Sequence, residues 1–206
     1  AGIAASGSLK LTGDATAQGV ITLTVADSEV SVAAAAEDSA ASLATALAAA
    51  VNAERDLPVT AQAATGTVTL TAKNKGTLGN GIALAYACTV PGITPTLTAM
   101  TGGQKDPDIA DALPAVFAAD YTIYCVPWAA QAPLAALREH LDNVSGPLEQ
   151  RGAISVYAST GTLSAATTLA GQLNAGRITG ALLPGSVTPS EQIAAAYAAV
   201  LASEED

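Results

Sequence analysis

One loop of this sequence has residue types that often bind phosphate in enzymes. In the segment 156–171, "VYASTGTLSAATTLAG", an apolar run is followed by Ser159, Thr160, Gly161 and Thr162, and then by a helical pattern. At the end of a strand in an α/β protein, this order places free backbone N–H groups and the positive end of a helix beside an anion. The chemistry to be tested is therefore nucleotide or phosphate binding.

The rest of this loop favours a structural role. A P-loop needs a lysine after its glycine, and the chain has no lysine beyond Lys105. A dinucleotide-binding loop needs three spaced glycines, whereas Gly161 is the only glycine in the loop. The hydroxyls of Ser159, Thr160 and Thr162 supply caps for the next helix, so its first N–H groups need no ligand. We predict a capped helix and no cofactor-binding residue.

Nucleophilic or metal-assisted catalysis would depend on His140, because the sequence contains one histidine. It lies in "LREHLDN" between Glu139 and Leu141, on a stripe that we interpret as solvent-facing. No Gly-x-Ser-x-Gly elbow exists to present a serine to it. Cys88 and Cys125 lie in apolar strand-like runs without a neighbour at ligand spacing, which predicts buried structural thiols. We assign no catalytic residue and no metal ligand.

Three pairs of acidic residues are close together in the sequence: Glu37 and Asp38, Asp106 and Asp108, Glu204 and Asp206. Paired acids hydrolyse glycosides when they flank a cleft, but sugar clefts also need aromatic platforms, and the chain has one Trp and one Phe. We expect Asp106 and Asp108 to begin a helix, "DIADAL", because acids favour its positive end. The residue chemistry therefore predicts a protein that is not an enzyme.

The composition excludes several classes of partner. The chain has 206 residues, is 50% hydrophobic and 3% aromatic, and carries a net charge of −10. Nucleic acids and anionic membranes bind clustered cations, so neither is an expected partner. No apolar run is long enough to span a bilayer, and no signal peptide is evident. Reduced cysteines are typical of a cytosolic protein.

The first half has the period-2 alternation of strands. We predict strands over 7–13, 18–25, 28–34, 57–64, 66–74, 80–90 and 94–100, the last of them an edge strand, with a hairpin at 26–28. A helix over about 38–54, capped by Asp38 or Ser39, buries Leu43, Leu47, Ala50 and Val51. One helix packed on an antiparallel sheet or small sandwich is the expected result.

The segment 101–108, "TGGQKDPD", is the predicted domain boundary, because the pattern changes on either side of it. Strands are then predicted over 120–128, 151–159 and 178–185, and helices over 107–118, 131–144, 163–176 and 189–203. Pro114 should bend or end the first helix. The inward-facing residues are expected to be Leu134, Leu137, Leu141, Val144, Ile193, Tyr197, Val200 and Leu201. Strand–helix alternation implies right-handed crossovers and a parallel sheet covered on both faces.

The predicted fold class is therefore a two-domain α+β and α/β protein. Residues 1–102 form a small β-rich domain with one helix, and residues 103–206 form a layered α/β domain with a parallel sheet.

Several stretches resemble the tail sheath proteins of Mu-like contractile phages and prophages. In the second half these are "DPDIADALPAVFAADYTIYCVPW", "LREHLDNVSGPLEQRGAISVYASTGTLSAATTLAGQLNAGRITGALLPG" and "EQIAAAYAAVLASEED". In the first half, "GTVTLTAKNKGTLGNGIALAY" resembles the β-rich inserted domain of the same proteins. The resemblance extends over essentially the whole chain.

The resemblance implies a structural subunit that polymerises around a tail tube, is anchored at a baseplate, and contracts to drive the tube through a bacterial envelope. Its partners would be other sheath subunits, tube and baseplate proteins, and its location the virion, after synthesis in the host cytoplasm. No nucleotide, metal or catalytic residue is expected. The family's terminal arms, which add strands to a neighbour's sheet, have no counterpart here. We therefore expect an incomplete core and a fragment that is monomeric in dilute solution.

Two other classes of function remain open from the residues. The α/β half could be a nucleotide-binding domain or a small-molecule enzyme, and the Thr-rich β half could be an adhesin-like binding module. A rise in melting temperature with ATP, NAD or FMN would identify the first, since ligand at a hundred times its Kd adds about 2.7 kcal/mol of stability.

Overall fold

The computed structural model describes residues 2–204, and its contacts divide the chain into two compact units between Asp106 and Pro107. We call them the N-terminal unit and the C-terminal unit. The first has antiparallel sheets and the second a parallel sheet, which confirms the predicted mixed fold class. The dividing point lies inside the segment 101–108 that the sequence marks as a boundary.

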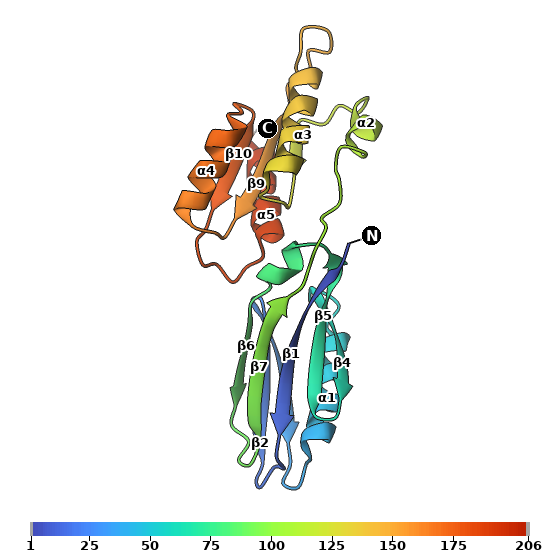
Figure 1. Cartoon of the computed structure of the whole chain (residues 1–206), viewed down its shortest axis with the longest axis vertical. Helices are drawn as coiled ribbons and strands as arrows, with labels where there is room; N and C mark the ends of the chain where they lie inside the picture. The colour runs from blue at the N-terminus through green and yellow to red at the C-terminus, as the bar shows by residue number, and fades with distance from the viewer. Residues whose placement is uncertain (1, 205–206) are drawn as a thin grey trace. The chain divides into compact units, whose positions relative to one another are not determined.

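The N-terminal unit contains seven strands, one α-helix and a short 3-10 helix among the described residues (Figure 1). Their bounds are β1 Ala4–Thr12, β2 Gly19–Val25, β3 Ser28–Ala34, α1 Ala40–Ala53, β4 Val59–Ala64, β5 Thr67–Lys75, η1 Leu78–Gly81, β6 Leu84–Cys88 and β7 Thr94–Thr101. The strands form two antiparallel sheets, in the orders β4-β5-β1-β7 and β3-β2-β6. β7 is an edge strand, as the sequence predicts.

One core fills this unit, because alternate residues of most of its strands are buried. Leu9 of β1 and Leu23 of β2 are fully buried, and α1 contributes Leu47 and Val51 to the same cluster. α1 contacts strands of both sheets, mainly the edge strands β4 and β3. The side chain of Ser39 accepts a hydrogen bond from the Ser42 N–H, so the predicted cap is confirmed at the second of its two candidate residues.

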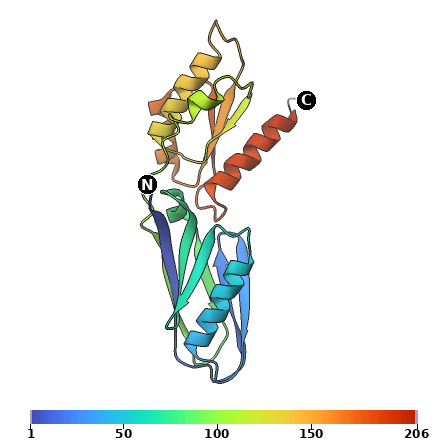
Figure 2. The ribbon, with the colours of Figure 1, turned by 90° about the vertical axis from the view of Figure 1, so that its right-hand side faces the viewer.

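The C-terminal unit is a three-layer α/β arrangement. Its elements are α2 Leu113–Val116, β8 Ile123–Cys125, α3 Gln131–Val144, β9 Ile154–Ser159, α4 Leu163–Leu173, β10 Ile178–Leu182 and α5 Ser190–Glu204. The strands form one parallel sheet in the order β10-β9-β8. α5 lies on one face of this sheet and α3 and α4 on the other, as Figure 2 shows. The predicted parallel sheet with both faces covered is confirmed.

The helix predicted over 107–118 is wrong in its length and in the role given to Pro114. Only the four residues of α2 are helical, and Pro114 lies in the first turn of that helix instead of ending it. A proline is tolerated there because the N–H that it lacks has no partner within a helix. Asp106 and Asp108 also do not begin a helix, so that prediction is wrong. The Asp106 carboxylate accepts bonds from the N–H and hydroxyl of Thr77, and Asp108 accepts one from the Ala110 N–H.

The predicted inner face of the last helix is partly wrong. Ala194 is fully buried, while Ile193, Tyr197 and Leu201 are only partly buried and Val200 is 54% exposed. α5 packs mainly against β9 and β8, and a small residue allows the closest approach of the helix to the sheet. No helix within residues 2–204 is long and apolar enough to cross a membrane.

Candidate functional site

The loop before α4 is capped by its own side chains. Thr162 is the N-cap of α4, and its hydroxyl accepts a bond from the Ala165 N–H at 3.3 Å. The Ser159 hydroxyl accepts a bond from the Gly161 N–H at 3.2 Å. Thr160 contributes a backbone carbonyl that accepts from the Gly185 N–H. The predicted cap is therefore found at Thr162 and not at Thr160. These bonds satisfy backbone donors that a phosphate would otherwise need.

The two cysteines are less buried than the sequence predicts. Cys88 is partly buried and Cys125 is exposed, so the prediction of two buried thiols is wrong. Cys125 ends β8, a three-residue strand at the edge of the sheet, where only β9 lies beside it. Cys88 pairs with Ile21 near the end of β6, also an edge strand. A strand at the edge of a sheet has a neighbouring strand on one side only, so its side chains are less covered.

His140 is buried, with 6% of its surface exposed, so its predicted solvent-facing position is wrong. It continues the apolar face of α3, three residues after Leu137, and the segment that includes α2 packs over it. His140 Nε2 lies 3.1 Å from the Tyr124 hydroxyl, and the Phe117 ring meets the imidazole edge-on at a centroid distance of 6.0 Å. The histidine therefore belongs to the core of the C-terminal unit.

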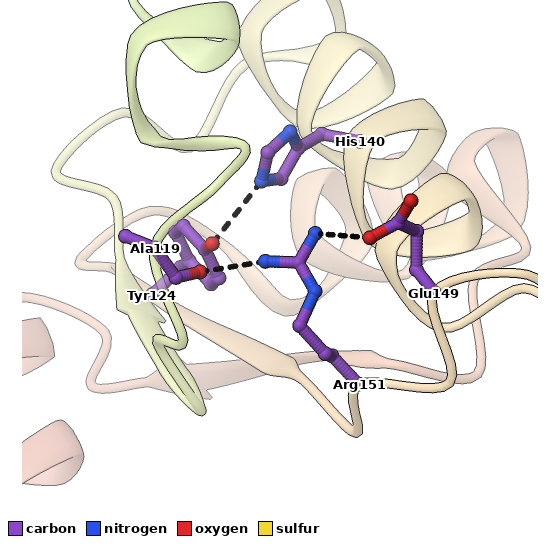
Figure 3. A network of polar contacts seen from close by, with 5 residues as sticks. All are labelled: Ala119, Tyr124, His140, Glu149 and Arg151. Atoms are coloured by element: carbon purple, nitrogen blue, oxygen red, sulfur yellow. Dashed lines mark hydrogen bonds and ion pairs between the residues drawn. The ribbon is translucent and has the colours of Figure 1, made fainter.

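Arg151 completes this cluster (Figure 3). Its guanidinium donates a hydrogen bond to the Ala119 carbonyl at 2.8 Å and pairs with the Glu149 carboxylate at 3.1 Å. The guanidinium carbon lies 5.1 Å from the centre of the Phe117 ring, within the range of a cation–π contact. Arg151 thus joins the segment 117–119 to the chain that enters β9. We call Phe117, Tyr124, His140, Glu149 and Arg151 the aromatic–arginine cluster.

The electrostatics of the aromatic–arginine cluster keep its two central groups neutral. Burial lowers the pKa of His140, and the positive charge of Arg151 lowers it further. Burial raises the pKa of Tyr124, against the opposing effect of Arg151. At pH 7 the imidazole is therefore uncharged and the phenol keeps its proton. A neutral His–Tyr pair provides a hydrogen bond between two elements, and it holds neither an ionised nucleophile nor a carboxylate that would activate the imidazole.

A groove of about 440 Å³ lies beside this cluster, between the α2 segment and α3. Leu113, Phe117 and Ala136 supply apolar atoms, and Glu139, His140 and Asn143 supply polar ones. Within residues 2–204 no group of three or more His, Cys, Asp or Glu side chains is placed to hold a metal ion. Asp38, Asp106 and Asp108 accept hydrogen bonds from backbone N–H groups, and Asp206 lies outside the described residues. The assignment of no catalytic, cofactor or metal residue stays a prediction.

Comparison with known proteins relates the whole chain to one kind of protein. No family model matches the chain. The chain is 32% identical, over 206 residues, to the Mu-like prophage FluMu tail sheath protein of Haemophilus influenzae. The resemblance to Mu-like tail sheath proteins is confirmed.

The match to this tail sheath protein includes 98% of the present chain, and so it extends over both units. The chain spans 42% of the length of that relative. The aromatic–arginine cluster and the capped loop both lie within the matched length. Their contacts are internal to the C-terminal unit, as expected for residues that stabilise a structural domain.

Proposed function

We propose that this chain is a structural part of a contractile phage tail sheath, and that it acts by assembly and not by catalysis. The observation that carries the proposal is the similarity to a tail sheath protein over 98% of the chain, in both the β-rich and the α/β unit. A shared inserted module alone would match one unit only. Many copies of the whole sheath subunit would assemble around the tail tube and attach to a baseplate. The assembled sheath would then shorten and drive the tube through the host envelope.

The chemistry of the candidate site is compatible with this role. Ser159 and Thr162 occupy two backbone donors at the start of α4, the N–H groups of Gly161 and Ala165. The buried histidine bonds a neutral tyrosine. The energy of contraction would then come from contacts between subunits, without nucleotide hydrolysis. The proposed partners are other sheath subunits and the tube and baseplate proteins, and the proposed location is the virion tail, after synthesis in the host cytoplasm.

The experiment that tests this proposal is expression of the intact gene product that contains this chain, followed by negative-stain electron microscopy. We expect tubes or contracted sleeves to form without added nucleotide. The 206-residue chain, expressed separately, serves as the comparison and is expected to remain monomeric by light scattering. An intact product that stays monomeric under every salt concentration would contradict the proposal. A separate chain that forms tubes would contradict only the expectation that other segments are needed for polymerisation.

A further inference from the structure

The outward face of the sheet β4-β5-β1-β7 is a regular array of hydroxyl groups. Strand register places the outward residues in three rows across the sheet: Thr60, Thr71 and Ser6; Gln62, Thr69, Ser8 and Thr98; Ala64, Thr67, Lys10 and Thr96. Ser8 and Thr67 are partly buried and the others are exposed. The four strands lie side by side in Figure 1, with α1 behind them. We call this surface the hydroxyl face.

The hydroxyl face also differs in charge from the rest of the chain. Its four strands contain Lys10, Lys73 and Lys75 and not one Asp or Glu, although the chain as a whole carries a net charge of −10. Lys73 donates to the backbone carbonyl of Arg55, and neither salt bridge found among the described residues involves this face. Within residues 2–204, none of these three lysines therefore forms a salt bridge.

Acidic residues lie at one edge of the other sheet of the same unit. Asp27 occupies the turn between β2 and β3, and Glu29 projects from β3, the edge strand of the other sheet. Both side chains are exposed, and neither forms a salt bridge among residues 2–204. Glu29 pairs with Thr24 of the neighbouring strand β2, so a hydroxyl-bearing side chain lies beside the acid. One unit thus carries two surfaces of opposite charge and similar polarity.

We infer that the hydroxyl face of one copy of this chain binds the β2–β3 edge of a second copy, with Lys10 facing the acids at Asp27 and Glu29. This inference rests on the proposed function, because it concerns neighbours in a polymer. The two surfaces are different, so the contact is heterologous and repeats from copy to copy without closing into a dimer. A surface of threonine, serine and lysine buries little apolar area, and its attraction weakens as salt is added. Such a contact is weak between free copies and adds up in an assembly.

A charge exchange between two variants of the 206-residue chain tests the inference. Lys10→Glu places two acidic surfaces against each other, and Glu29→Lys places two basic ones. In sedimentation at low salt, and at protein concentrations far above those at which the chain is monomeric, we expect each variant alone to self-associate about fivefold more weakly than the wild type, the effect of one exposed ion pair. An equal mixture should regain association, because the carboxylate introduced in the first variant then faces the ammonium group introduced in the second. Arg177→Glu in the C-terminal unit matches the change in net charge of Lys10→Glu and should leave association within about twofold, since no partner charge is assigned to it.

A mixture that associates no better than the two separate variants would overturn the inference. Far-UV circular dichroism of each variant shows whether it is folded, and Lys10→Gln, which removes the charge without reversing it, should give an intermediate effect. Failure of this contact is distinguishable from failure of the proposed function. If the intact gene product forms sleeves and the mixture does not associate, only the assigned contact is wrong. If the mixture associates and no sleeves form, only the sheath role is wrong.

Discussion

The two units of this chain are stabilised in different ways. In the N-terminal unit a single cluster of 24 buried hydrophobic residues fills the space between two sheets and α1, and nearly every strand contributes to it. The corresponding cluster of the C-terminal unit has eight buried members, and the aromatic–arginine cluster adds polar and aromatic contacts beside it. The larger core buries more apolar surface, whereas the smaller one is accompanied by the contacts that Arg151 and His140 make between elements.

The largest expected effect comes from the core of the N-terminal unit. Leu47→Ala removes a fully buried side chain from α1 and should lower the free energy of unfolding by about 2–5 kcal/mol. Trp128, the only tryptophan, packs against the core of the other unit. Far-UV circular dichroism should therefore show an early transition in urea, while Trp128 fluorescence keeps its wild-type midpoint. Thr45→Ala, at an exposed position of the same helix, should change either signal by less than about 0.5 kcal/mol.

This difference between the units also explains what the sequence could predict. Strands of the N-terminal unit alternate between buried and exposed residues, so period-2 reasoning locates them to within a few residues. The bounds of α3 are predicted correctly, because its apolar residues recur with the period of a helix. The burial of His140 is missed, because helical spacing alone does not tell which segment covers a residue at the border of the apolar face. Its position three residues after Leu137 and one before Leu141 was the available signal.

The partners of His140 were beyond the reach of sequence patterns. Tyr124 lies 16 residues before it, and Arg151 approaches the cluster from the chain that enters β9. Contacts of this kind are set by packing between elements and leave no periodic trace. The four-residue extent of α2 has the same origin, since Pro114 is compatible with a helix start as well as with a helix end.

In the C-terminal unit the second-largest effect is expected for Arg151→Ala. The substitution removes the bond to the Ala119 carbonyl, the ion pair with Glu149 and the contact with Phe117. We expect a loss of about 1.5–3 kcal/mol, the usual contribution of hydrogen bonds to a charged group. Here the urea midpoint from Trp128 fluorescence should fall. Glu149→Gln, which keeps the other two contacts of Arg151, should cost less than about 1 kcal/mol. Equal losses for both variants would show that the ion pair carries the effect.

A smaller effect is expected at the loop before α4. Thr162→Ala removes the observed cap and should cost about 1 kcal/mol, whereas Thr160→Ala should be nearly neutral because the Thr160 side chain caps nothing in the structure. Both variants should bind nucleotide no differently from the wild type in isothermal titration calorimetry. Loss of nucleotide binding in the Thr162 variant would restore the enzyme interpretation of this loop.

The pH dependence of the C-terminal unit should be the smallest of these effects. The pKa of His140 is lower in the folded state than its ordinary value of 6.5, so the unfolded chain binds the proton more readily. The contribution of His140 is complete above pH 6.5 and is lost as the pH falls below that value toward the pKa of the folded state. Urea midpoints from Trp128 fluorescence should decline over this range. His140→Gln should flatten the decline, and an unchanged slope in that variant would assign it to other groups.

Antibody labelling of phage tails tests the central claim most directly. Antibodies raised against the 206-residue chain would be applied to particles of the phage or prophage that encodes it, before and after contraction, and located by gold labelling in the electron microscope. A sheath role predicts label along the whole length of the tail, over a shorter distance once the tail has contracted. Label confined to the capsid, to the baseplate or to material outside the particles would contradict the assignment of this chain to the sheath.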